Sequence, residues 1–230
     1  MAIYAIADLH LSFNTNKPMN VFGWIDYEEK IKNDWLKKVN NNDIVMLPGD
    51  FSWEIKLQNT YKDFSFINEL PGTKILLKGN HDLWWTTLKS MREFLKQNEF
   101  SNIDFLYNNS YEYDGKILAG TRGWDIKADT DQDKKIIIRE VRRLENSILN
   151  GIKKYGENKE IIAFMHYPPI ERGNTNNEFT KVLQKYNVKT CIYGHLHGEA
   201  HKYAIEGNID GINYKLVSCD YTNFKLIKIS

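Results

Sequence analysis

Five short apolar runs in this chain are each followed within three residues by aspartate, asparagine or histidine, and this repetition constrains the fold more than any other feature. Short apolar runs bounded by turn residues are typical of buried strands. They cover residues 2–7, 43–47, 74–77, 161–165 and 190–193. The segments that follow them are Asp8-Leu9-His10, Gly49-Asp50, Gly79-Asn80-His81-Asp82, His166 and Gly194-His195-Leu196-His197. In an open α/β sheet the carboxyl ends of parallel strands share one edge, where ligands bind, so we expect these polar groups to meet.

Helical periodicity separates the early strands. Apolar residues recur every four positions from Tyr27 to Val39 and every three positions from Tyr61 to Leu70, which predicts helices over residues 27–39 and 57–70. A third helix is expected around residues 83–96, where Asp82 could cap its N-terminus. The alternation of strands and helices over this first part predicts a parallel sheet covered by helices.

The remainder of the chain is mixed. We expect a long helix over residues 131–155, a short one over 178–186, and further strands at 103–107, 111–113, 117–119, 200–205, 214–218 and 224–229. Turns are expected at Asp114-Gly115, at residues 206–208 and at Asp210-Gly211. Two layers of sheet with helices outside would accommodate these elements. No linker rich in proline, glycine or serine divides the sequence, so we expect one domain over residues 1–230.

The residue types at the strand ends point to divalent metal ions. The candidate ligands are Asp8, His10, Asp50, Asn80, His166, His195 and His197. Carboxylate, amide and imidazole donors without any thiolate suit Mn, Fe, Zn or Mg rather than copper(I) or an iron–sulfur cluster. Seven ligands are too many for one four-coordinate zinc ion and about right for two ions that share a bridging carboxylate. The glycines before the ligands would let backbone and phosphate approach closely and would permit positive φ angles.

The ordered motifs DLH, GD, GNHD, a lone histidine and GHLH resemble those of the calcineurin-like metallophosphoesterases, from residue 8 to residue 197. The strings LPGDFSW, LLKGNHDLWW, GTRGW, HYPP and YGHLHGEAHK resemble one bacterial branch of predicted phosphohydrolases. The resemblance implies an α/β fold in the form of a four-layer αββα sandwich, with two mixed sheets flanked by helices. It also implies a metal-dependent phosphoesterase with a binuclear centre at the strand ends.

The resemblance further implies a role for each motif residue. Asp8, His10 and His197 would hold one ion, Asn80, His166 and His195 the other, and Asp50 would bridge both. His81 would be the general acid or would stabilise the transition state electrostatically. The sequence departs from the fuller motif GDxxD, because Trp53 stands where some members have the aspartate that orients this histidine. Glu54 and Asp82 are the remaining candidates for that orienting role.

The expected chemistry is attack by a metal-activated hydroxide on a small phosphate monoester or diester. Mn²⁺ is the ion we expect, with Fe, Zn and Mg as alternatives. With two ions, two carboxylates and one hydroxide, the centre would keep a charge of roughly +1 to meet a phosphate. Arg122, between Gly120 and Gly123 after a strand, is the candidate for a further substrate contact. The tryptophans near the motifs could pack in the core, line the cleft or stack on a base.

Composition argues against several partners. The chain has 31 Lys and Arg against 30 Asp and Glu, so no basic excess supports a nucleic-acid-binding surface or a nuclease of the same fold. No apolar stretch of 18 residues predicts a transmembrane helix, and the N-terminus does not resemble a signal peptide. Cys191 and Cys219 are predicted to be reduced, buried thiols of a cytoplasmic protein. The residues also leave open a non-catalytic scaffold for protein binding, and a separate zinc site at His195, His197 and His201.

Overall fold

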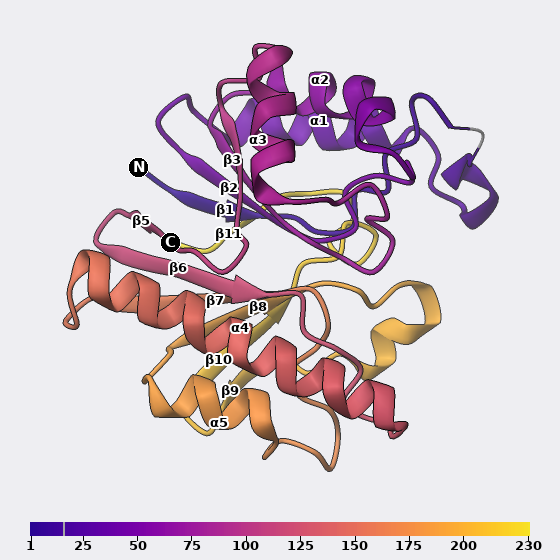
Figure 1. Ribbon diagram of the computed structural model, residues 1–230. Coiled ribbons are helices and arrows are strands. Elements are labelled where there is room, and N and C mark those ends of the chain that lie inside the picture. The colour runs from indigo at the N-terminus through magenta and orange to yellow at the C-terminus, as the bar shows by residue number, and fades with distance from the viewer. Residues whose placement is uncertain (16) are drawn as a thin grey trace.

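Two β-sheets pack face to face and carry helices on their outer sides (Figure 1). The computed structural model describes residues 1–15 and 17–230. The first sheet has the spatial order β11 (Ile227–Lys228), β1 (Ile3–Ala5), β2 (Ile44–Pro48), β3 (Thr73–Leu77), β4 (Ile103–Phe105). The second has the order β5 (Tyr111–Tyr113), β6 (Lys116–Thr121), β7 (Glu160–Met165), β8 (Thr190–Tyr193), β10 (Ile212–Leu216), β9 (Gly207–Ile209).

The inner strands of each sheet run parallel to one another, whereas β11, β5 and β9 pair antiparallel with their neighbours. Helices α1 (Tyr27–Lys38), α2 (Tyr61–Asn68) and α3 (Leu88–Gln97) cover the first sheet (Figure 1). Helices α4 (Asp131–Tyr155) and α5 (Glu178–Lys185) cover the second. Three 3-10 helices are formed by Met19–Phe22, Leu57–Thr60 and Gly198–Tyr203. The predicted four-layer αββα sandwich is therefore confirmed.

Strand β1 shows why the buried strands read as continuous apolar runs. Its alternate residues Ile3 and Ala5 pack between the two sheets, together with Phe164 of β7. Tyr4 and Ile6 point the other way, into the core beneath the helices of the first sheet. Successive side chains of a strand point to opposite faces, so a strand covered on both faces needs apolar residues at every position. Among the described residues, no helix is both long and apolar enough to cross a membrane.

The third predicted helix begins later than expected. Residues 83–87 are not helical, and α3 begins at Leu88, where Thr87 caps it by accepting the N–H of Ser90. Trp84 and Trp85 are pulled into the core, where their rings contact that of Phe105. Burial of two large aromatic rings outweighs the local preference for helix, since each contributes a large apolar area.

The predictions for the C-terminal region are partly wrong. The segment expected as a strand over 200–205 is largely the 3-10 helix Gly198–Tyr203, and the turn expected at 206–208 contributes to strand β9. The carboxylate of Asp220 accepts the backbone N–H of Gly198 and lies 3.2 Å from Nε2 of His201. These two contacts hold the segment as a 3-10 helix instead of an extended strand. The predicted strand 224–229 is reduced to β11. The local pattern of apolar residues carries no information on the contact of Asp220 with Gly198 and His201, so it could not predict this structure.

Candidate metal centre

All seven candidate ligands lie at the carboxyl ends of the parallel strands, where the two sheets meet. Backbone hydrogen bonds join these ends: the N–H of Asp8 donates to Gly49 at 2.9 Å, and that of Gly194 donates to His166 at 3.1 Å. The two sheets are linked directly, because the N–H of His195 donates to Oδ2 of Asp8 at 3.0 Å. The polar groups at the strand ends therefore meet, as the sequence predicted, both within each sheet and between the two sheets.

The ligands form two groups. Asp8, His10 and His197 each offer one ligand atom, and these three atoms lie within 4.8 Å of one another. Nε2 of His197 is 3.3 Å from Oδ1 of Asp8, whereas Nδ1 of His10 is buried and has no hydrogen-bond partner within residues 1–15 and 17–230. Asp50 and His166 form the second group with His195, also within 4.8 Å. Each group has the size and donor types of one metal site.

Asn80 completes the second group, and its contacts show that the group suits a cation. Its Oδ1 lies 2.7 Å from Nε2 of His166 and 2.9 Å from Nδ1 of His195. Nδ1 of His166 lies 3.1 Å from the carbonyl oxygen of Pro48 and must donate to it, which leaves Nε2 as an acceptor. An amide oxygen and an imidazole lone pair therefore face each other. A positive ion between them would satisfy both, so these residues fit a divalent metal.

Asp50 lies between the two groups. Its Oδ2 is 3.4 Å from Nε2 of His166 in one group and 3.8 Å from Nε2 of His10 in the other. Its Oδ1 faces away and accepts the backbone N–H of His81 at 2.8 Å. One carboxylate oxygen is thus fixed by the protein and the other faces both groups, as a bridging ligand requires.

The glycines before the ligands make room for ligand side chains. A Cβ atom at Gly79 would collide with Oδ1 of Asp50, and one at Gly49 would collide with the ring of His166. Gly194 likewise lies against the carboxylate of Asp8. Positive φ angles were expected at these glycines, but of the three only Gly49, at +99°, has one.

The ligands themselves carry the backbone strain. Asp8, His10, Asp50 and His195 have φ angles of 62°, 45°, 52° and 76°. Residues other than glycine are uncommon in this region, and strain of this kind clusters at functional sites. The surrounding strands and loops hold these four residues in the conformations that turn their side chains together.

The charges of the centre are poorly balanced by the protein alone. Burial, and then the charge of Asp8, raise the pKa of Asp50 to about 8. Burial lowers the pKa values of His10 and His195 to about 3, so both rings are neutral near pH 7. Burial also opposes charge on His197, but the carboxylates of Asp8 and Asp220 raise its pKa to about 10. Metal ions bind neutral imidazoles and ionised carboxylates, so His10 and His195 are ready to bind near pH 7, whereas a bound ion would have to displace a proton from Asp50 and from His197.

Two carboxylates that are not candidate ligands support the centre. Asp220 lies with its Oδ1 2.9 Å from Nδ1 of His197, which directs Nε2 of that ring toward Asp8. Sequence reasoning missed Asp220, although it follows the predicted strand 214–218 and the strand-end rule could have found it. Asp82 accepts the N–H groups of Asp50 and Gly79, and therefore neither caps α3 nor is free to orient His81.

The ring of His81 lies against Trp53, with ring centroids 4.5 Å apart, and 5.6 Å from the ring of His10. Within residues 1–15 and 17–230, no hydrogen bond joins this ring to a carboxylate. Trp53 also stacks on His10, at 4.6 Å with an interplanar angle of 22°. Trp53, the residue that departs from GDxxD, thus contacts both histidines. The side chain of Glu54 is buried, and its Oε1 has no hydrogen-bond partner among the described residues. The role of His81 stays a prediction.

Arg122 is placed differently from the other candidates. Its guanidinium lies 4.6 Å from the centre of the Trp124 ring and 4.0 Å from Oε1 of the buried Glu140. It lines a small cavity with Lys78 and Arg143, and it is absent from the wall of the large cavity at the centre. Its contact with substrate stays a prediction.

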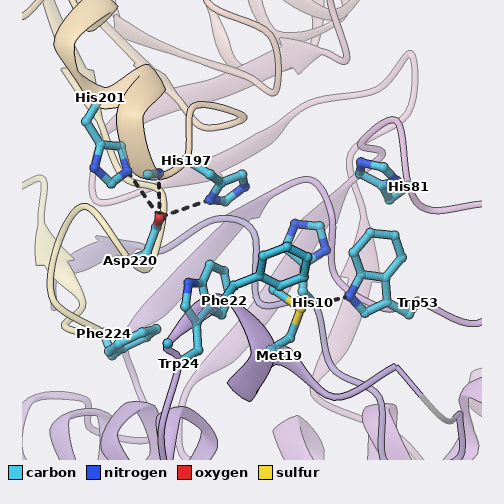
Figure 2. A pocket seen from close by; sticks show the side chains of 12 residues that line it. His10, Met19, Phe22, Trp24, Trp53, His81, His197, His201, Asp220 and Phe224 are labelled. Atoms are coloured by element: carbon cyan, nitrogen blue, oxygen red, sulfur yellow. Dashed lines mark hydrogen bonds and ion pairs between the residues drawn. The ribbon is translucent and has the colours of Figure 1, made fainter.

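A cavity of about 570 Å³ opens beside the first group, and His10, His81 and His197 line it. Figure 2 shows Trp53 beside His81, and Asp220 joined to His197 and His201. Trp24 and Trp53 line this cavity, so these two tryptophans take the cleft-lining role. The separate zinc site at the three histidines is not formed, because His195 and His197 belong to different groups and His201 faces Asp220.

Comparison with known proteins agrees with this geometry. Residues 1–199 match the family model for calcineurin-like phosphoesterases, whereas no curated protein sequence matches the chain. A phosphopantetheinyl hydrolase from Mycobacterium tuberculosis has a similar structure, with 11% identity, a TM-score of 0.55, and coverage of 99% of this chain and 95% of that one. A Thermus thermophilus protein shows 13% identity, a TM-score of 0.58, and coverage of 98% and 96%.

A protein of unknown function from Aquifex aeolicus has 20% identity and a TM-score of 0.50, with coverage of 99% of this chain and 95% of that one. At such identities the structural likeness concerns the fold alone. The family match covers most of the chain and includes every motif from which the centre is built. The chain therefore belongs to the calcineurin-like phosphoesterases, which are metal-dependent hydrolases of phosphate esters.

Proposed function

We propose that this protein hydrolyses a small phosphate monoester or diester at a centre of two divalent metal ions. Asp8, His10 and His197 hold one ion, and Asn80 holds the other together with the histidines His166 and His195. Asp50 bridges the two. The observation that carries this proposal is the position of Asp50 Oδ2, which faces both groups. Since the seven ligands come from both sheets, we infer that residues 1–230 act as one domain.

When bound, a pair of divalent ions supplies positive charge for the phosphoryl oxygens and lowers the pKa of bound water. The protein orients the ligands around that charge. Asp220 holds the ring of His197 in the tautomer that leaves Nε2 free, and Pro48 does the same for His166. The side chain of His81 lines the cavity and belongs to neither group of ligands, so it can donate a proton to a leaving oxygen or stabilise charge there.

A nuclease or a non-catalytic scaffold fits the site less well. The described wall of the large cavity carries no lysine or arginine, which disfavours a nuclease that must hold a polyanionic backbone. A non-catalytic scaffold would not need seven strained or closely packed ligand residues. Mn²⁺ remains the expected ion because the donors are oxygen and nitrogen atoms.

The direct test is metal-dependent hydrolysis. Protein freed of metal with a chelator and dialysed should not hydrolyse p-nitrophenyl phosphate or bis-p-nitrophenyl phosphate, and Mn²⁺ should restore the activity best among Mn²⁺, Fe²⁺, Zn²⁺ and Mg²⁺. Full hydrolysis by chelated protein that contains no metal, measured by mass spectrometry, would contradict the proposal.

A further inference from the structure

The large cavity differs sharply in chemistry from the metal centre that it adjoins. Next to the histidines, its wall is formed by the apolar side chains Met19, Phe22, Trp24, Trp53 and Phe224 (Figure 2). These residues come from the segment after β1, the loop after β2 and the C-terminal segment before β11. An apolar wall that begins at the ligand His10 is in the right place to receive the organic group of a phosphate ester.

Charged groups at this wall are few. Asp220 is the one carboxylate among the described lining residues, and His197 and His201 already face it. The nearest cation in these contacts is Lys17, whose amine lies 4.6 Å from the centre of the Trp53 ring. Lys17 is not among the described lining residues, so a second phosphate or a carboxylate that entered the cavity would lose its hydration without a cation in that wall to pair with.

The rings of Trp24, Trp53 and Phe224 in this wall are already engaged. Trp53 contacts His10, His81 and Lys17 around its ring. Trp24 meets Phe224 edge to face, with centroids 5.5 Å apart. Rings that contact one another in this way form a continuous apolar wall rather than a free platform for a nucleobase, and a flexible chain can follow such a surface.

The apolar surface continues outward from the cavity. Phe22, which lines the mouth, is 70% exposed, and its neighbour Val21 is 72% exposed. Ile25 is also exposed on the same short segment. Of these three exposed side chains only Phe22 is among the described lining residues, so it is the one that a ligand in the cavity would cover.

We infer that the substrate is a phosphate ester of an uncharged apolar alcohol, whose chain lies along Trp24 and Phe22 while the phosphate faces the metal centre. This inference rests on the proposed function and adds the class of substrate to it. Substrates with a second anionic group or a nucleobase are disfavoured by the same wall.

The test uses uncleavable ligands, so that binding is measured apart from turnover. Methyl-, butyl- and octylphosphonate are titrated by calorimetry into Mn²⁺-loaded protein. Affinity should rise by about two- to fourfold for each methylene that enters the cavity. Equal affinity for the methyl and octyl compounds would overturn the inference, as would tighter binding of adenosine monophosphate than of octylphosphonate.

Two exposed neighbours provide matched variants. Phe22→Ala should lower the octyl-to-methyl affinity ratio several-fold, whereas Val21→Ala, on the same 3-10 helix but outside the cavity wall, should leave it unchanged. An unchanged octyl-to-methyl affinity ratio in Phe22→Ala would show that the alkyl chain of the ligand does not lie against Phe22. Methyl and octyl phosphate, assayed for phosphate release, separate the two proposals. Length-dependent binding without hydrolysis of any ester would refute the proposed function and leave the binding site standing.

Discussion

The carboxylate of Asp82 accepts the backbone N–H of Asp50 at 2.9 Å, so a residue after β3 fixes the loop after β2 that carries the bridging candidate. The same carboxylate accepts the N–H groups of Phe51 and Gly79 and the indole N–H of Trp84. A buried carboxylate surrounded by donors in this way is costly to remove, because the donors would be left unpaired. The position of Asp50 between the two ligand groups is therefore set by hydrogen bonds that involve no metal.

Asp50→Asn should reduce metal binding more than Asp8→Asn. The Asp50 carboxylate offsets charge on both ions, whereas Asp8 belongs to one group. We expect Asp8→Asn to keep an ion at the group of Asn80, His166 and His195, and Asp50→Asn to lose both ions. Metal content per chain, measured by mass spectrometry after dialysis, decides this. An Asp50→Asn protein that retains two ions as tightly as the parent would disprove the bridge.

Gly79→Ala should disrupt the centre through space alone. The new methyl group would collide with Oδ1 of Asp50 and push that carboxylate away from the two groups. We expect metal content to fall while the fold persists by circular dichroism. Gly211→Ala is the matched control: its φ of +84° makes alanine cost about 1–2 kcal/mol, but its Cβ meets open space, so metal content should be unchanged. Equal metal content in both variants would contradict the steric explanation.

His81→Asn should retain both ions but lose activity unequally. A positioned acid contributes ~10²–10⁴-fold, and only where the leaving group needs a proton. The loss should be large for an alkyl phosphate and small for a p-nitrophenyl ester, although contact with Trp53 in place of a carboxylate compresses the difference. Steady-state rates on matched esters measure it. Equal losses would make His81 an electrostatic stabiliser, and a lost ion would make it a ligand.

Lys74 should give the fold a distinctive pH dependence. Its amine is buried and donates to the carbonyl oxygens of Leu70 and Gly72 at 2.6 and 2.9 Å, and burial lowers its pKa to about 7. Between that value and the higher pKa of an unfolded lysine, the unfolded chain binds more protons, so stability contributed at this position rises with pH. Urea unfolding at pH 6.5, 8 and 9.5 should show the parent gaining stability relative to Lys74→Met. Lys62→Met, at an exposed position of α2, controls for the lost charge. A difference that stays constant with pH would show that Lys74 remains protonated when folded.

The candidate ligands could be found from the sequence because one rule of topology links them. Parallel strands of an α/β sheet end at one edge, so polar residues after Ala7, Pro48 and Leu77 had to approach one another wherever those strands paired. The helix over residues 131–155 could be predicted from the sequence as well, since its helical pattern extends over many residues and Thr130 and Asp133 form a capping box at its start. Such features depend on neighbours in the chain, and the local sequence therefore carries them.

Other features arise only when distant segments meet. Asp220 contacts His197 and Gly198 because β10 lies beside β8. These contacts hold the segment expected as the strand 200–205 in a 3-10 helix. The apolar wall of Trp24 and Phe224 joins segments 200 residues apart, whose pairing no local pattern encodes. Local sequence therefore predicted most of the strands and helices and the polar residues at the strand ends. The tertiary structure decided which carboxylate orients each histidine and what lines the cavity, because those depend on side-chain packing across two sheets rather than on the period of any one segment.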